Sequence, residues 1–255
     1  MTDVGRAFKE AARRGDTHMV ASLLEDVVNP VVRSMAMEAA AQHGHVDVVK
    51  LLLESGQVDP AVQNNFPIRV ASRGGHIAVV SLLLKSDLVD PAAANNDAIS
   101  QAAYNGHAAV VEKLLDSNSV DPGVYNNQAI RYAAQKGYIE TVKLLLKSDL
   151  VNPADKNNEA IRWAAEAGHE DIVEILLRDN RVLAGRLPRP DLESNDPLAQ
   201  YLGRVVLASI VSRQTLNRYM RSTHKPTTEY KLISKIMSYQ QSVKKQPRDI
   251  RSYLI

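Results

Sequence analysis

The feature that most constrains this chain is a segment of two short apolar stripes that recurs every 31 residues. One copy, NNQAIRYAAQKGYIETVKLLLKSD, is matched by three others, NNFPIRVASRGGHIAVVSLLLKS, NNDAISQAAYNGHAAVVEKLLDS and NNEAIRWAAEAGHEDIVEILLRD. The four begin at Asn64, Asn95, Asn126 and Asn157, a looser copy begins at Arg33, and a more degenerate one spans Asp3 to Asn29. A period in this range is typical of a solenoid, in which each unit buries its apolar face only against its neighbours.

Each copy predicts a pair of helices. In the copy that begins at Asn126, Ile130, Ala133 and Ala134 form one narrow apolar stripe at helical spacing, and the small alanines allow a second helix to approach closely. A second apolar face follows at Ile139, Val142, Leu145 and Leu146.

The residues around these stripes predict where the helices begin and end. Asn127 is suited to accept the free amide hydrogens at the start of the first helix. Gly137 is suited to end it with a positive φ. The loops contain Val-Asp-Pro or Val-Asn-Pro, where proline prevents the second helix from continuing.

The repeated unit resembles the ankyrin repeat. The family pattern T-P-L-H-x-A-A-x-x-G-H-x-x-V-V-x-L-L-L is matched by the runs 66–72, Gly75-His76, Val79-Val80 and 82–84. The resemblance covers residues 3 to 184 and implies an all-α solenoid of about six helix-turn-helix repeats. Two features depart from it: arginine replaces the usual threonine and histidine of the first helix, and the unit is shorter than the usual about 33 residues. We therefore expect the loop-tip hairpin of the family to be reduced or replaced by a plain turn.

Charge and composition divide the chain into a repeat stack at 1–184, a proline-containing linker at 185–197 and a basic helical segment at 198–255. Residues 1–180 hold 17 Lys and Arg against 24 Asp and Glu, whereas residues 181–255 hold 14 against 5. We expect a helix from Pro197 to Arg213 to cover the open end of the last repeat, around Ile172, Leu176 and Leu177. We expect a second helix from about Thr228 to Val243.

The chain contains no cysteine, which excludes disulfides, thiolate metal sites and cysteine nucleophiles. It has no run approaching about 18 uninterrupted apolar residues, so no transmembrane segment is predicted. We expect a soluble monomer that is cytoplasmic or nuclear.

No residue pattern indicates catalysis, and neither a cofactor nor a metal is predicted. Histidines follow the glycine in four copies, at His45, His76, His107 and His169. Neighbouring helices pack about 8 to 10 Å apart, whereas two ligands of one zinc ion lie within about 4 Å of each other. We therefore interpret these histidines as hydrogen-bonding or packing residues.

The resemblance implies that the protein binds a partner protein on the concave side and the loop tips of the stack. In ankyrin-like stacks the contacting residues lie after the paired alanines of the first helix and at the loop tips. Here these positions are Gln42, His43, Arg73, Tyr104, Asn105, Gln135, Lys136 and Glu166, with Tyr125, Asp155 and Lys156 at the tips. They differ between copies, as a recognition surface would, although unconstrained drift produces the same variation.

Tyrosine is enriched at binding hot spots, so Tyr104 and Tyr125 are the candidate anchors; ordinary exposure is the alternative. We expect Tyr132 and Trp163 to pack partly between repeats.

The basic C-terminal segment supports alternative roles. Its lysines and arginines are suited to phosphates of nucleic acid, to an acidic membrane surface or to the acidic repeats beside them. No nucleic-acid-binding module is recognisable in it. Leu187-Pro188 resembles only faintly the start of the segment by which some ankyrin proteins recruit ubiquitin-ligase machinery, and Pro190 spoils that match.

Overall fold

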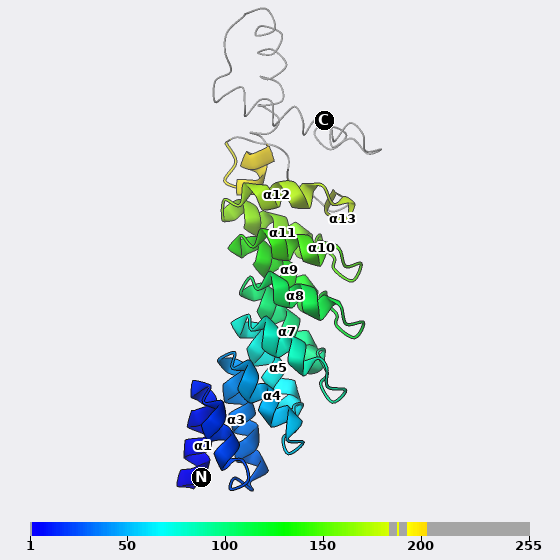
Figure 1. Cartoon of the computed structure of the whole chain (residues 1–255). Helices are drawn as coiled ribbons and strands as arrows, with labels where there is room; N and C mark the ends of the chain where they lie inside the picture. Colours follow the sequence, from blue (N-terminus) through cyan, green and yellow to red (C-terminus); the bar gives the residue numbers. More distant parts are fainter. Residues whose placement is uncertain (1, 184–187, 189–192, 203–255) are drawn as a thin grey trace, which may run out of the picture.

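The computed structural model describes residues 2–183, 188 and 193–202. Figure 1 shows their helices stacked in pairs along one axis. The helices are α1 (Asp3–Arg14), α2 (Thr17–Leu23), α3 (Pro30–Gln42), α4 (Val46–Glu54), α5 (Val62–Gly74), α6 (Ile77–Leu83), α7 (Ala93–Tyr104), α8 (Ala108–Leu115), α9 (Val124–Lys136), α10 (Ile139–Leu146), α11 (Asp155–Glu166), α12 (Glu170–Leu177) and α13 (Asn180–Leu183). Among the described residues there is no strand, and the predicted all-α solenoid of six helix pairs is confirmed.

The stack has two layers. The first helices of the repeats, α1, α3, α5, α7, α9 and α11, form one layer, and the second helices form the other. First helices of neighbouring repeats contact each other more extensively than second helices do. Small alanines in the first helices explain this difference, because they let the backbones approach. We call the exposed side of α3, α5, α7, α9 and α11 the inner face.

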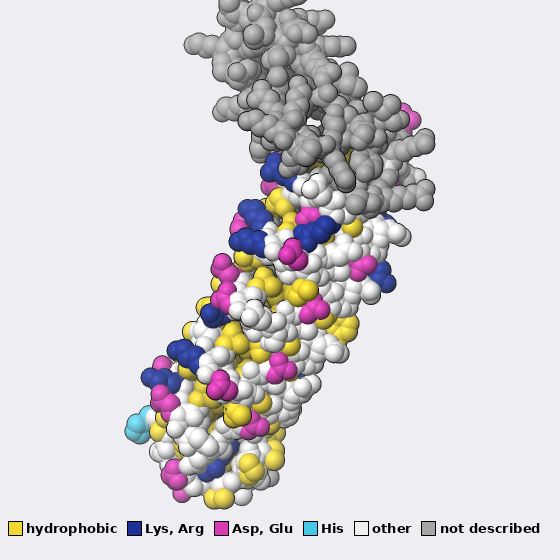
Figure 2. Space-filling view, turned by 90° about the vertical axis from the view of Figure 1, so that its right-hand side faces the viewer, with side chains coloured by type: hydrophobic (Ala, Val, Ile, Leu, Met, Phe, Trp, Pro, Cys, Tyr) yellow, Lys and Arg dark blue, Asp and Glu magenta, His cyan; other side chains and the backbone are white. Residues whose placement is uncertain are grey.

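The loops between repeats project from one side of the stack (Figure 1). Figure 2 views that side and shows hydrophobic side chains along the length of the described repeats, with charged side chains scattered around them. Leu88 and Leu150 occupy the same loop position two repeats apart and are 66% and 60% exposed. The following valines, Val89 and Val151, point into the core.

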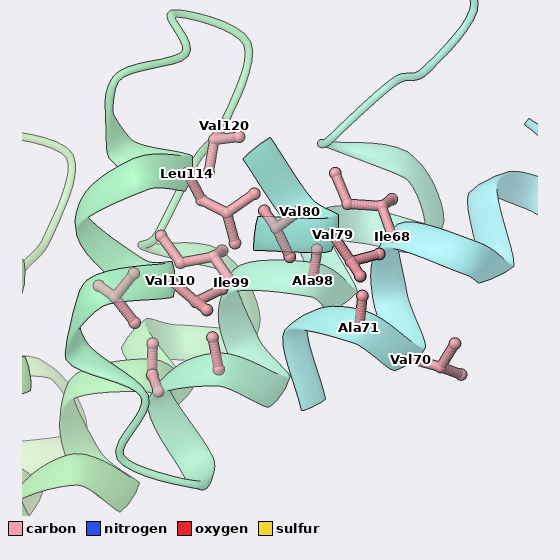
Figure 3. Close-up of a cluster of buried hydrophobic side chains, with 14 of the residues drawn as sticks. Ile68, Val70, Ala71, Val79, Val80, Ala98, Ile99, Val110, Leu114 and Val120 are labelled. Carbon is pink, nitrogen blue, oxygen red and sulfur yellow. The ribbon is translucent and has the colours of Figure 1, made fainter. Parts of the chain in front are cut away.

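The core is shared between repeats. In Figure 3, side chains of one repeat meet side chains of the next in a single buried cluster. The labelled members are Ile68, Val70, Ala71, Val79, Val80, Ala98, Ile99, Val110, Leu114 and Val120. Because this cluster is built from consecutive repeats, no repeat buries its apolar stripes alone.

The beginning of α5, α7, α9 and α11 has an unusual backbone, a left-handed turn just after the first residue of each. Three consecutive residues adopt the left-handed conformation in four repeats, for example Tyr125, Asn126 and Asn127 with φ of 53°, 56° and 58°. Asparagine tolerates this region better than most residues, which explains the recurring Asn-Asn pair. This turn stands where the family has its hairpin, as the shorter unit led us to expect.

The second asparagine of three of these pairs joins adjacent repeats. The side-chain oxygens of Asn65, Asn96 and Asn127 accept the backbone N–H 25 positions later, at 2.9, 2.7 and 2.6 Å. The predicted helix-capping role of Asn127 is therefore wrong. Its oxygen accepts from the amide of Asn152 in the next loop, because the left-handed backbone directs the side chain away from its own helix.

The histidines form a second ladder between repeats. The Nε2 atoms of His45, His76, His107 and His169 each hydrogen-bond a backbone carbonyl of the preceding repeat at 2.9 to 3.0 Å. Their rings cover the left-handed glycines that end the preceding first helices, so that a Cβ atom on Gly75 would lie 2.5 Å from His107. The interpretation of these histidines as hydrogen-bonding and packing residues is confirmed.

Arg181 lies in α13, where the proline of the earlier loops is missing, and it binds the loop that follows α10. Its guanidinium donates to the carbonyls of Leu146, Ser148 and Val151 at 2.9, 3.1 and 2.8 Å, and it pairs with Asp179 at 2.7 Å. Burial raises the pKa of Asp179, but the hydrogen bonds and positive charge of Arg181 outweigh burial, so the pKa lies below that of an ordinary aspartate.

The C-terminal end of the stack is covered as far as the structure describes it. Residues 197–202 are helical, and Asp196 accepts the backbone N–H of Leu198 at 2.9 Å. Leu198 is buried and belongs to the continuous core of the stack, which also contains Ile172 and Leu176. The rest of that predicted helix, the helix expected from Thr228 to Val243 and most of the basic segment lie outside the described residues. No described helix is long and apolar enough to cross a membrane.

Leu145→Ala should lower the free energy of unfolding by about 2 to 5 kcal/mol, because it opens a cavity in a core shared by neighbouring repeats. Chemical denaturation followed by circular dichroism measures the change, and Lys147→Ala, at an exposed position two residues away, is the control. A loss below about 0.5 kcal/mol for Leu145→Ala would contradict the assignment of its helix face.

Arg181→Met should destabilise the last repeat by about 2 to 4 kcal/mol, because three loop carbonyls and a carboxylate lose a charged donor. Since the folded-state pKa of Asp179 is lowered, the pair stabilises the fold above the pKa of an ordinary aspartate and loses that contribution as the pH falls below about 4. Thermal melts at pH 7 and pH 3 should therefore show a smaller difference between the variant and the wild type at pH 3. An equal difference at both pH values would contradict the role of the pair.

Candidate functional site

The inner face carries residues that differ between the repeats. Equivalent positions of successive first helices line up along the stack, because each helix packs beside the next. One column contains Gln42, Arg73, Tyr104, Gln135 and Glu166, and the column beside it contains Ala39, Val70, Gln101, Tyr132 and Trp163.

Three aromatic rings form a continuous row on this face. The rings of Tyr104 and Tyr132 meet edge to face with centroids 5.1 Å apart, and those of Tyr132 and Trp163 are tilted with centroids 5.8 Å apart. Tyr104 is 42% exposed, while Tyr132 and Trp163 are partly buried. The expected packing of these last two residues between repeats is confirmed, yet their outer edges extend the surface that Tyr104 begins. We call these three residues the aromatic row.

Two cationic side chains lie over rings of the aromatic row. The Nζ atom of Lys136 lies 5.6 Å from the ring centre of Tyr104, and the guanidinium carbon of Arg131 lies 5.3 Å from that of Trp163. Such contacts stabilise by about 0.5 to 1 kcal/mol at exposed sites. The rings are therefore held in defined positions before any partner arrives.

Ion pairs between first helices account for the recurring arginines. Arg69 donates to Asp97 of the next repeat at 2.7 Å, and Arg131 pairs with Glu159 of the next repeat. Their side chains are only 14 to 25% exposed, so solvent screens these pairs less than it screens a surface pair. Arg131 also donates to the carbonyl of Tyr125 at 3.3 Å. Arg69 and Arg131, two of the arginines that replace the family's threonine and histidine, thus join neighbouring repeats.

The structure places eight of the predicted contact residues together at the ends of the first helices. Gln42, His43, Arg73, Tyr104, Gln135, Lys136 and Glu166 are exposed there, and Asn105 is partly buried. Two of them also cap a helix: Asn105 Nδ2 donates to the carbonyl of Gln101 at 2.8 Å, and His43 Nδ1 lies 2.9 Å from that of Ala39. Their availability to a partner is accordingly lower than that of their neighbours.

The three predicted tip residues lie apart from that group, in the left-handed turns. Tyr125 is 51% exposed and its hydroxyl accepts from Asn95 Nδ2 at 3.1 Å. Asp155 accepts from Asn127 Nδ2 at 3.0 Å and from the backbone of Lys156, so its carboxylate serves the turn. Lys156 is exposed.

The sequence did not indicate that Tyr132 and Trp163 join Tyr104 in one row. Tyr104 stands three positions further along its helix than they do, so comparison of the copies places it in a different column. One turn of helix separates the two columns, which brings residues three apart to the same side. The aromatic row could have been predicted from this three-residue spacing together with the stacking of the repeats.

The loop side has a depression of about 450 Å³ between two neighbouring loops. Its apolar lining includes Leu115, Leu144 and Leu150, and Glu112, Asp116 and Lys147 supply charges of both signs. The aromatic row has no counterpart here.

The part of the chain that the structure describes shows no cluster of metal-ligating side chains. Within it no three or more His, Asp or Glu side chains are placed to hold a metal ion. The repeated histidines instead bond the backbone of the preceding repeat.

Tyr132→Ala should expose Trp163, the chain's single tryptophan. We expect its fluorescence to become more accessible to acrylamide, and the free energy of unfolding to fall by roughly 0.5 to 1.5 kcal/mol beyond the loss from buried area, because two ring contacts disappear. Gln128→Ala, in the same helix, is the control. Quenching that is the same in Tyr132→Ala and the wild type would contradict the contact between the rings.

Comparison with known proteins agrees with this architecture. A family model described as ankyrin repeats (3 copies) matches residues 8–97 and again residues 99–184. No curated protein sequence matches the chain significantly. The two matches together span more than half of the chain and follow the helix pairs of the stack, and the chain therefore belongs to the ankyrin-repeat family.

Proposed function

We propose that this protein acts by binding a partner protein on the inner face of its repeats, as a scaffold or adaptor rather than as an enzyme. Ankyrin repeats are generally protein-interaction modules, which supports a protein as the partner. The observation that most favours the inner face is the aromatic row of Tyr104, Tyr132 and Trp163, which crosses three consecutive repeats.

The aromatic row has the properties of an interface anchor. Tyrosine and tryptophan supply large contact areas at low cost in side-chain entropy, and they dominate binding hot spots. Here the rings are also held by each other and by the cations Arg131 and Lys136. Because the surface is ordered in advance, binding loses little further conformational entropy.

The organisation of the chain fits this role. We propose that residues 1–184 form the binding unit of a monomer, that 185–197 connect it to 198–255, and that this basic segment supports a second contact. A chain without cysteine suits a reducing compartment, which favours action in the cytoplasm or the nucleus.

Tyr104→Ala should weaken partner binding by about 5- to 30-fold, the loss typical of a hot-spot side chain of about 1 to 2 kcal/mol. The wild-type chain and the variant are immobilised, and the proteins that each retains from a lysate are quantified by mass spectrometry. Since the ring is 42% exposed, the free energy of unfolding should change by no more than about 1 kcal/mol.

Leu150→Ser on the loop side is the matched control, because it removes an exposed apolar side chain from another surface. Proteins retained by the wild type should be retained by this control. Loss with Leu150→Ser but not with Tyr104→Ala would move the binding site to the loop side.

A further inference from the structure

Charge is sorted between the two sides of the regular repeats. The first helices α5, α7, α9 and α11 contain six Lys and Arg against four Asp and Glu, a net charge of +2. The remaining parts of the same repeats, residues 75–92, 105–123, 137–154 and 167–183, contain six against eleven, a net charge of −5. The inner face is thus the positive side of an otherwise negative stack.

Ion pairing decides which of these charged side chains remain available. The two acidic residues Asp97 and Glu159 are engaged by Arg69 and Arg131 of the preceding repeats. Asp155 accepts two hydrogen bonds within its turn. Of the first-helix carboxylates, Glu166 therefore remains the most available to a partner.

Three cations remain available beside the aromatic row. Arg73 is exposed one repeat before Tyr104 in the same column. Lys136 lies against the ring of Tyr104 with its ammonium at the surface. Arg162 stands at the position of Arg69 and Arg131 in the last repeat, is partly exposed, and lines a shallow pocket with Asn157, Glu166 and Asp196.

We propose that the inner face of repeats three to six binds an acidic segment of the partner protein, with apolar side chains of that segment on the aromatic row. Arg73, Lys136 and Arg162 pair with its carboxylates. This inference rests on the proposed function and adds the chemistry of the partner. Arginine is suited to the planar carboxylate group, since its guanidinium donates two parallel hydrogen bonds to it.

A peptide fits this surface better than a nucleic acid does. Nucleic acid presents one phosphate after another and is bound by dense arrays of lysine and arginine. Here Glu166 lies among the cations, and the net charge of −5 on the rest of these repeats repels a polyanion. A mixed acidic and apolar peptide meets the separated cations and rings without requiring continuous positive charge.

To test this inference, a displayed library of random 12-residue peptides is panned against the full chain. A triple variant, Arg73→Glu, Lys136→Glu and Arg162→Glu, is panned in parallel. A control variant, Lys113→Glu, Lys143→Glu and Arg178→Glu, changes the net charge equally, within α8 and α10 and at the C-terminal end of α12. Affinities of selected peptides and of a 12-nucleotide oligothymidylate are then measured by fluorescence anisotropy, and circular dichroism verifies that both variants fold.

The wild-type chain and the control variant should select peptides that are enriched in Asp and Glu around Leu, Phe or Trp. The inner-face variant should bind these peptides at least about tenfold more weakly than the wild type does. Selected peptides that require Tyr104 but lack acidic enrichment would overturn this inference and leave the proposed function standing. Equal weakening by both variants would also overturn it. So would tighter binding of the oligothymidylate than of the peptides, if the inner-face variant loses that binding and the control keeps it. A failure to select any peptide would overturn this inference, and the retention of proteins from a lysate then decides the proposed function separately.

Discussion

Burial of apolar stripes between successive repeats is the interaction on which the rest of this structure depends. Each helix pair has alanines on its first helix and valines and leucines on its second, and these side chains meet those of the neighbouring pairs. Polar contacts between repeats then fix the register. An asparagine oxygen accepts a backbone N–H of the next loop, a histidine ring hydrogen-bonds a carbonyl at the end of the preceding first helix, and an arginine pairs with a carboxylate of the next repeat. Hydrophobic burial supplies the stability, and the polar ladders specify how the units align.

The binding surface follows from this construction. Because the first helices stack side by side, side chains from different repeats become neighbours although they lie about one period apart in sequence. The rings of Tyr104, Tyr132 and Trp163 form one row for that reason. The same stacking pairs acidic side chains of the inner face with arginines and leaves other cations beside the rings. The core residues are similar in every repeat, whereas the surface residues differ and give this stack a surface of its own.

The fold was largely predictable from the sequence, because the period and the helical spacing of apolar residues both reflect local physics. The glycine that ends each first helix was predicted for the same reason, and Gly137 has a φ of 82°. The role of Asn127 was predicted wrongly because the left-handed conformation is unfavourable for residues other than glycine, so three such residues in a row are not expected from the sequence. The side chain of Asn127 is held by the backbone of the next loop, which local sequence does not indicate. The contacts of Arg181 with a loop more than thirty residues earlier leave no local signal. The exposure of the predicted contact residues followed from their helix positions, but the ring contacts required the three-dimensional stacking.

Native-state hydrogen exchange, followed by mass spectrometry, tests most directly whether each repeat is stable only through its neighbours. In a stack of this kind stability is set by the units and the interfaces between adjacent units, and terminal units have one interface instead of two. The amides of α5, α7 and α9 should therefore exchange most slowly, and protection should decrease step by step toward α1. Equal protection in every repeat, or slow exchange in α1 and fast exchange in α7, would contradict the account.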